Sequence, residues 1–356
     1  MELFKFELKK ICFFQKGLLI GGLCLAVTCL FLVLFPEMKD PRIKESSFQY
    51  MKLLNEFYGN DSPEKQNEIR KRYTEVNETL AEFEIMHKKY SEGILSESEW
   101  KTYSERYEKA KVIENAVNIF FETADRFSHQ NTEINAQYIY QYSWNTIFFL
   151  HSFPNIPLLL GILFISTSIF PMEADSGMLT IIKSSKNGRY HFIVIKTVVL
   201  ILFITVLCIL GLFAELVIFY LRGMLNDSNA PVQSIQFFTD TAINVTLRQA
   251  LVISLLIRAG GMISIGLLSF CLSTVIQGNM QAFLTSIGIL IISYLLLLIT
   301  KKGEGVLPFL GIYFASSSEV IKRINSINSI IGSLIIRFIE VLSGCILMIK
   351  YFVHDK

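Results

Sequence analysis

The sequence predicts an all-α polytopic membrane protein, with six transmembrane helices and a large extracytoplasmic helical hairpin inserted between spans one and two. The chain has 356 residues, of which 52% are hydrophobic, and its mean hydropathy of +0.45 is too apolar for an ordinary soluble protein. Charge is also segregated, because residues 37–146 hold 15 of the 33 Lys and Arg and 20 of the 31 Asp and Glu. A water-exposed domain therefore interrupts a membrane domain.

Three segments follow from this pattern: residues 1–36, with the N-terminus and span one; residues 37–146, the polar insert; and residues 147–356, with spans two to six. Crossing about 30 Å of hydrocarbon takes about 20 residues at a rise of about 1.5 Å each. Apolar runs of that length occur at Gly17 to Phe35, Ile147 to Pro171, Ile193 to Tyr220, Gln249 to Ile276, Ala282 to Thr300 and Ile330 to Phe352. The first run is too long for a signal-peptide core, so we expect it to be retained.

Positive charge in the short segments predicts the orientation of the chain. The N-terminus and the connection between spans two and three are both rich in basic residues, at Lys5, Lys9, Lys10, Lys16, Lys183, Lys186, Arg189 and Lys196. We expect both to be cytoplasmic, which also places the C-terminus inside and the polar insert outside. Lys301, Lys302, Lys322 and Arg323 then lie outside and argue against this topology.

Two parts of the membrane domain allow alternatives. Arg258 and the Gly260-Gly261 pair sit within span four and mark either a kink or its true start, in which case residues 243–257 would form an interfacial helix. The segment 301–329 is rich in Gly and Ser, and whether it re-enters the membrane as short, protein-covered helices is left open.

The polar insert carries a heptad pattern. Ser62 is a candidate N-cap with Pro63 at the first helical position, and the apolar positions continue to Tyr90 before Gly93 ends the helix. Ser96 and Glu99 form a capping box that starts a second helix. The sequence therefore predicts two antiparallel helices of about 30 residues, projecting about 40–45 Å.

Aromatic side chains follow the facing stripes of these two helices. They either hold the hairpin together, which is the favoured interpretation, or form an external binding surface for a peptide. With 15 basic against 20 acidic residues, the insert is suited to a cationic amphipathic partner. The candidate surface residues are Tyr73, Tyr90, Trp100, Tyr103 and Tyr107.

Several functional classes lack their sequence signals. There is no basic block for nucleic acid, no phosphate-binding glycine loop, no H-E-x-x-H or C-x-x-C motif, and no catalytic constellation in the spans. The five histidines are scattered, and all six cysteines lie in or beside apolar runs. We expect no catalytic residue, no metal site, no cofactor bound by this chain and no nucleic-acid partner.

The most informative segment is the connection between spans two and three, which reads FPMEADSGMLTIIKSSKNGR from Phe170 to Arg189. Acidic residues, a glycine, a short apolar stretch, a small-residue turn and then Arg and Lys follow in order: Glu173, Asp175, Gly177, Leu179, Ser185, Arg189 and Lys196. This pattern, with six spans and a lysine-rich N-terminus, resembles the permease subunit of an ABC transporter of the type-2 (ABC-2) exporter family. The resemblance covers the membrane domain but not the insert.

The resemblance implies that a short coupling helix near residues 173–187 seats in a groove of a separate ATP-binding subunit. The implied coupling residues are Glu173, Asp175, Gly177, Met178, Leu179, Ile182 and Arg189. Their chemistry agrees, because acidic residues suit a helix N-terminus and the apolar ones can press into a partner. The alternative is an amphipathic loop whose basic residues bind anionic lipid.

Charges within the spans are the other candidates, since an ion in hydrocarbon must be paired or wetted. Glu215 and Arg258 are expected to face each other across adjacent antiparallel helices, as a structural ion pair or as part of a substrate path. Arg337 and Glu340 lie three apart and can pair within span six.

The sequence thus suggests a permease that couples ATP hydrolysis by a separate subunit to export of a hydrophobic or amphipathic substrate, such as an antimicrobial peptide. ATP and Mg would be bound by the partner ATPase, and a second permease subunit and membrane lipid are the other expected partners. The expected location is a bacterial plasma membrane. The alternative is a non-transporting sensor or scaffold that relays external ligand binding to a cytoplasmic ATPase. The sequence leaves open the substrate, the transport direction, whether the permease is a homodimer or a heterodimer, and whether accessory proteins bind the hairpin.

Overall fold

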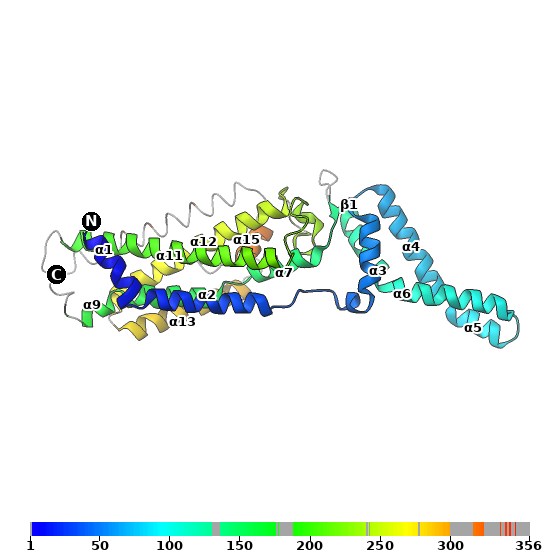
Figure 1. The fold of residues 1–356 in the computed structure, drawn as a ribbon, viewed down its shortest axis with the longest axis horizontal. Coiled ribbons are helices and arrows are strands. Elements are labelled where there is room, and N and C mark those ends of the chain that lie inside the picture. The colour runs from blue at the N-terminus through cyan, green and yellow to red at the C-terminus, as the bar shows by residue number, and fades with distance from the viewer. Residues whose placement is uncertain are drawn as a thin grey trace.

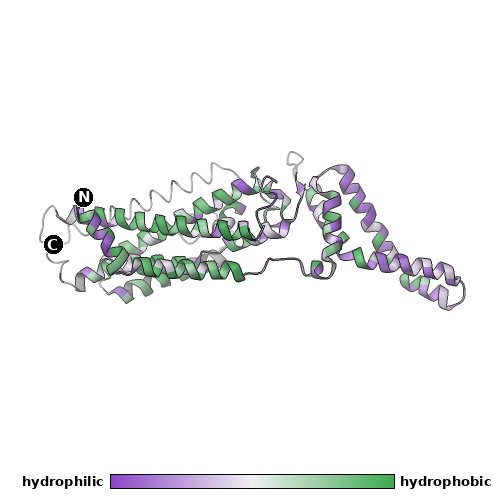
Figure 2. Cartoon of the chain, in the orientation of Figure 1, coloured by the Kyte–Doolittle hydropathy of each residue, from purple (hydrophilic) through white to green (hydrophobic). Residues whose placement is uncertain are grey.

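A computed structural model of the chain describes residues 2–129, 136–175, 177, 188–239, 241, 243–276, 278–299 and 316–323, with residues 335, 339, 342 and 346. The molecule is elongated, with a bundle of long helices at one end and a helical unit extending from the other (Figure 1). Hydropathy separates the same two parts, because the bundle is mainly hydrophobic and the extension mainly hydrophilic (Figure 2). We call the extension, residues 37–140, the projection.

The bundle is built from apolar helices. Among the described residues, four segments are long and apolar enough to cross a membrane, at Gly17–Leu34, Gln141–Glu173, His191–Leu221 and Leu247–Val275, and Asn279–Ser293 is a shorter apolar helix. The prediction of an all-α membrane protein is therefore confirmed. The sixth expected span, 330–352, lies outside the described residues except for four single positions.

The bundle elements follow the expected runs closely. They are α1 (Glu2–Lys9), the π-helical turn η1 (Lys10–Phe14), α2 (Gly17–Leu34), α7 (Gln141–His151), α8 (Ile156–Ser168), α9 (Pro171–Asp175), α11 (Gly188–Leu221), α12 (Leu247–Val275), α13 (Asn279–Ile299) and α15 (Ser317–Arg323). Helix α8 contacts α2, α12 and α13, and α11 contacts α12 and α2. Small residues allow this close approach, since a Cβ added at Gly266 of α12 would lie 2.4 Å from Ile204.

Helix α12 starts where its cap dictates. Thr246 and Gln249 form a reciprocal capping box, and the helix then continues without interruption past Arg258 and the glycine pair to Val275. The alternative of an interfacial helix over residues 243–257 is therefore wrong. Arg258 lies three turns inside a single long helix.

The second span is broken, which we did not predict. Helix α7 ends at His151 and α8 begins at Ile156, with Pro154 between them. Pro154 lacks a backbone donor and the residue before it disfavours helical geometry, whereas Pro157 is the second residue of α8, where a missing donor is tolerated. The side chain of Asn155 caps α8 by accepting a hydrogen bond from the Leu158 amide at 3.2 Å, in place of a backbone carbonyl of the preceding turn.

The described residues of the projection form four α-helices, whereas the sequence predicted two. The projection consists of α3 (Pro41–Phe57), β1 (Gly59–Asn60), α4 (Pro63–Ala81), α5 (Phe83–Ser91), α6 (Glu97–Ser128) and β2 (Gln137–Tyr138), with β1 and β2 antiparallel. Ser62 and Ser96 cap α4 and α6 as expected, but Glu82 divides the first predicted helix in two. Helix α6 packs against α4 on one face and α3 on another, so its Phe120 side chain meets Tyr50 of α3.

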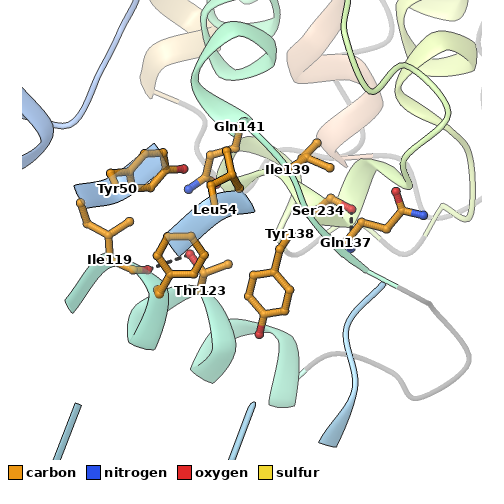
Figure 3. Close-up of a pocket in the computed structure, with 10 residues that line it drawn as sticks. Tyr50, Leu54, Ile119, Thr123, Gln137, Tyr138, Ile139, Gln141 and Ser234 are labelled. Carbon is orange, nitrogen blue, oxygen red and sulfur yellow. Dashed lines mark hydrogen bonds between the residues drawn. The ribbon is translucent and has the colours of Figure 1, made fainter. Parts of the chain in front are cut away.

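The projection joins the bundle at a loop region, residues 222–246, that contains the short helices η2 (Val232–Ser234) and η3 (Gln236–Phe238). The Gln137 amide donates to Ser234 Oγ at 2.9 Å, and an Arg126 Nη donates to the Ser234 carbonyl at 3.2 Å. A small pocket beside these bonds holds about 10 Å³, roughly one water molecule, and is lined by residues of the projection together with Gln141 and Ser234 (Figure 3). Hydrogen bonds therefore join the two parts of the molecule.

Helix α15 lies in the segment 301–329 that the sequence left open. It contacts α12 and α7, and Ser317, Val320 and Ile321 are buried there. At least this part of the segment is a short helix covered by protein, which meets the requirement for a non-spanning element beside hydrocarbon.

Candidate functional site

A buried ion cluster closes the end of the bundle that lies away from the projection. Glu173 of α9 places Oε1 2.6 Å from Nζ of Lys10 and 2.6 Å from Nζ of Lys196. Lys196 of α11 also donates to Glu7 Oε2 of α1 at 2.8 Å. We call these four residues the basal ion cluster.

The basal ion cluster is almost entirely shielded from solvent. The exposed fractions of Glu7, Glu173 and Lys196 are 2%, 1% and 0%. Lys196 Nζ also lies 4.5 Å from the centroid of the Phe192 ring. Two acids and two bases neutralise one another, so removing one member would leave a net charge in the cluster, at a cost of about 3–5 kcal/mol.

The cluster changes the role expected of Glu173. Its carboxylate faces inward, so it anchors α9 to η1 and α11 and does not lie on a surface open to a partner. Asp175 is the last residue of α9, and Arg189 is the second residue of α11. Gly177 is exposed and has a φ of +70°, a conformation that favours glycine. Met178, Leu179 and Ile182 lie outside the described residues.

A second polar cluster lies inside the bundle, around Glu215 of α11 and Arg258 of α12. Arg258 Nη1 donates to Glu215 Oε1 at 3.0 Å and to Oε2 at 2.9 Å, so the two expected residues do form an ion pair. Asn155 donates to Glu215 Oε1 at 3.2 Å and accepts from Thr28 of α2 at 2.9 Å. His151 Nε2 lies 3.5 Å from Glu215 Oε2. We call these five residues the central polar cluster.

The break between α7 and α8 is what brings the central polar cluster together. His151 is the last residue of α7 and Asn155 is the N-cap of α8, so the two side chains lie on either side of the break. Both contact Glu215. His151 Nδ1 continues the network to Ser254 Oγ at 2.8 Å, and Ser254 Oγ lies 2.6 Å from Ser317 Oγ of α15. The sequence signal for Asn155 and His151 was the proline pair within an apolar run.

The aromatic residues of the projection are used inside it. Tyr73 stacks on Phe121 with ring centroids 3.8 Å apart, and Tyr107 stacks on Phe83 at 3.9 Å. Trp100 lies 5.1 Å from Tyr90 and 6.1 Å from Tyr103, whose hydroxyl donates to the Thr79 carbonyl at 2.6 Å. These contacts support the favoured interpretation that the stripe holds the helices together.

Ion pairs on the projection lower the pKa of two carboxyl groups. Asp40 caps α3, and the bonds from Arg42 hold the pKa of Asp40 below its usual range. Arg72 of α4 does the same for the pKa of Glu56 on α3. Arg42 also reaches Glu122 of α6 at 2.6 Å, so these pairs join the three main helices of the projection.

The described part of the chain offers no candidate metal centre. No group of three or more His, Cys, Asp or Glu side chains in those residues is arranged to hold an ion. Comparisons with protein-family models, with curated proteins and with solved structures found no match for the chain. The function must therefore be argued from the chain itself.

Proposed function

We propose that this protein is the membrane-spanning subunit of an ATP-driven exporter of the ABC-2 type, working with a separate ATP-binding subunit and a second permease subunit. The observation that carries this proposal is the position of the basal ion cluster. Glu173 lies before the connection between the second and third spans and Lys196 lies after it. Their contact holds α9 and α11 together at the two sides of this connection. A partner that pushes on the connection between α9 and α11 would move α8, α11 and α1 as one unit.

The proposed orientation follows from the charges and the shape. The lysine-rich N-terminus and the connection at 176–187 belong at the cytoplasmic face, where an ATPase can reach them. The projection extends from the opposite end of the bundle and would lie outside a bacterial plasma membrane (Figure 1). Together with 330–352, this arrangement gives six spans with both termini inside and a helical hairpin outside.

In this mechanism ATP and Mg bind only to the partner subunit. ATP binding draws two ATPases together, and the coupling segment near 173–187 carries that motion into the paired membrane domains. The domains then switch access from the cytoplasmic side to the outside. The cargo is a hydrophobic or amphipathic molecule, with a cationic antimicrobial peptide the leading class because the 37–146 insert has 20 acidic against 15 basic residues.

The test is to purify the chain from its native membrane in mild detergent and identify what accompanies it. We expect an ATP-binding subunit in about equal amount, and substrate movement when both are placed in vesicles. Recovery of the chain without any nucleotide-binding partner would contradict the proposal. An ATPase whose hydrolysis responds to ligand without any flux would instead support a sensor or scaffold, an alternative favoured by the hydrogen bonds that join the projection to the bundle.

A further inference from the structure

Two adjoining cavities lie at the projection end of the bundle and differ in chemistry. The first holds about 560 Å³, and its walls are mainly apolar, with the phenylalanines at 31, 35, 149 and 153 among the lining residues. The second holds about 600 Å³ and is lined by charged groups that include Glu37, Lys39, Arg222 and Asp227. Each lies in the range of volumes that bind a small molecule.

The two cavities are stacked along the helices. Phe35 lines the apolar cavity and Glu37, two residues later, lines the polar one. Arg222 of the polar cavity donates to the carbonyl of Leu32, which lines the apolar cavity, at 2.8 Å. Helix α2 ends at Leu34, so the boundary between the cavities falls where a membrane helix leaves the hydrocarbon.

The apolar cavity opens on the side of the bundle that would face the hydrocarbon of a membrane. Residues at its walls are well exposed on the bundle surface, with exposed fractions of 44% for Val27, 52% for Phe31, 43% for Phe153 and 58% for Ile156. A ligand can therefore enter from within the membrane. The inner wall carries the central polar cluster, where Arg258 Nε is buried and has no hydrogen-bond partner among the described residues.

We propose that these cavities bind one phospholipid of the leaflet on the projection side. An acyl chain fits the apolar cavity because it brings no backbone donors that need partners there, whereas a peptide would. Arg222 suits the phosphate, because its bond to Leu32 uses only one of the five guanidinium donors, and Lys39, which pairs with Glu37 at 3.3 Å, is a second cation of the same cavity.

This inference goes beyond the proposed function, and its test needs neither ATP nor an ATPase. The delipidated chain is titrated in detergent with palmitoyl-oleoyl-phosphatidylglycerol, and bound lipid is counted by native mass spectrometry. Val27→Trp fills the apolar cavity from its rim. Leu23→Trp is the matched control, because Leu23 lies one turn away on α2, is 63% exposed and lines neither cavity.

We expect the wild type and Leu23→Trp to bind one phospholipid with similar affinity, and Val27→Trp to bind it about tenfold more weakly or worse. A diacylglycerol with the same chains should also bind about tenfold more weakly, because it lacks the phosphate. Equal binding by Val27→Trp and the control, or equal binding of both ligands, would overturn the proposal. So would displacement of the lipid by a cationic amphipathic peptide at equimolar concentration, which would assign the cavities to peptide.

Discussion

Lys196 Nζ lies 2.6 Å from Glu173 Oε1, in a contact that is almost completely buried and joins the end of the second apolar segment to the first turns of the third. Glu7 and Lys10 complete the neutralisation from the N-terminal helix. Residues distant in sequence thus fix both ends of the segment on which the proposed coupling depends. Disrupting this contact should affect stability and coupling together.

Glu173→Gln should destabilise the folded chain by about 3–5 kcal/mol, because buried Lys196 and partly buried Lys10 lose the carboxylate between them. Thermal unfolding in detergent, followed by tryptophan fluorescence, measures the change. The matched control is Glu75→Gln on the projection, where the pair with Lys71 is 3.9 Å long and both side chains are mostly exposed. Little change is expected there. If Glu173→Gln and the wild type unfold at the same temperature, the Glu173 charge makes no net contribution to the stability of the folded chain.

Replacing Met178 and Leu179 with Asp should release the ATP-binding subunit while the membrane domain stays folded, since the charges would prevent apolar contact with a partner groove. Co-purification followed by size-exclusion chromatography measures both properties. The control is Ile94→Asp, an exposed apolar residue of the projection, which should retain the partner. Full ATPase coupling in the double variant would remove the role assigned to this segment.

Glu215 and Arg258 should show strong energetic coupling. Glu215→Ala leaves a guanidinium unpaired in the bundle and should cost about 3–5 kcal/mol, whereas Glu215→Ala combined with Arg258→Met should cost less than the two single changes added together. Unfolding by a denaturing detergent supplies the free energies for the cycle. Additive losses would show that the 2.9 Å contact carries no interaction energy.

Trp100→Ala should loosen the projection, because the indole packs against Tyr90, Phe83 and Tyr103. We expect faster hydrogen exchange at the amides of α5 and the first turns of α6, with no change in the bundle. Val112→Ala, at an exposed position of α6, is the control. Unchanged exchange with lost ligand binding would instead make the stripe a binding surface.

The projection should weaken in acid. The folded-state pKa values of Asp40 and Glu56 are lowered by Arg42 and Arg72, so their stabilisation is present above the unfolded-state values of about 4 and is lost as pH falls through the folded values. Hydrogen exchange of α3, corrected for intrinsic rates, should rise below about pH 4. Asp40→Asn should exchange faster at pH 7 and show a shallower rise, and an unchanged profile would contradict this assignment.

Part of the candidate site was visible in the sequence. Glu215 and Arg258 stand out because charge is rare in apolar runs, and adjacent antiparallel helices bring them within reach. Glu173 and Lys196 stand out in the connecting segment, but their mutual burial does not, because either side chain is equally suited to a solvated surface. Glu7 gave no signal at all, since an acid in a short polar N-terminal helix looks like any exposed residue.

Local sequence patterns determined several helices and their caps. Apolar length fixed α2 and α11 to within a few residues, and side-chain capping fixed the starts of α4 and α6, because these features depend only on neighbours in the chain. Tertiary structure alone decided that α3 packs against α6 beside α4, and that Glu7 meets Lys196. Each of these requires packing energy from residues far apart in sequence, which no local pattern contains.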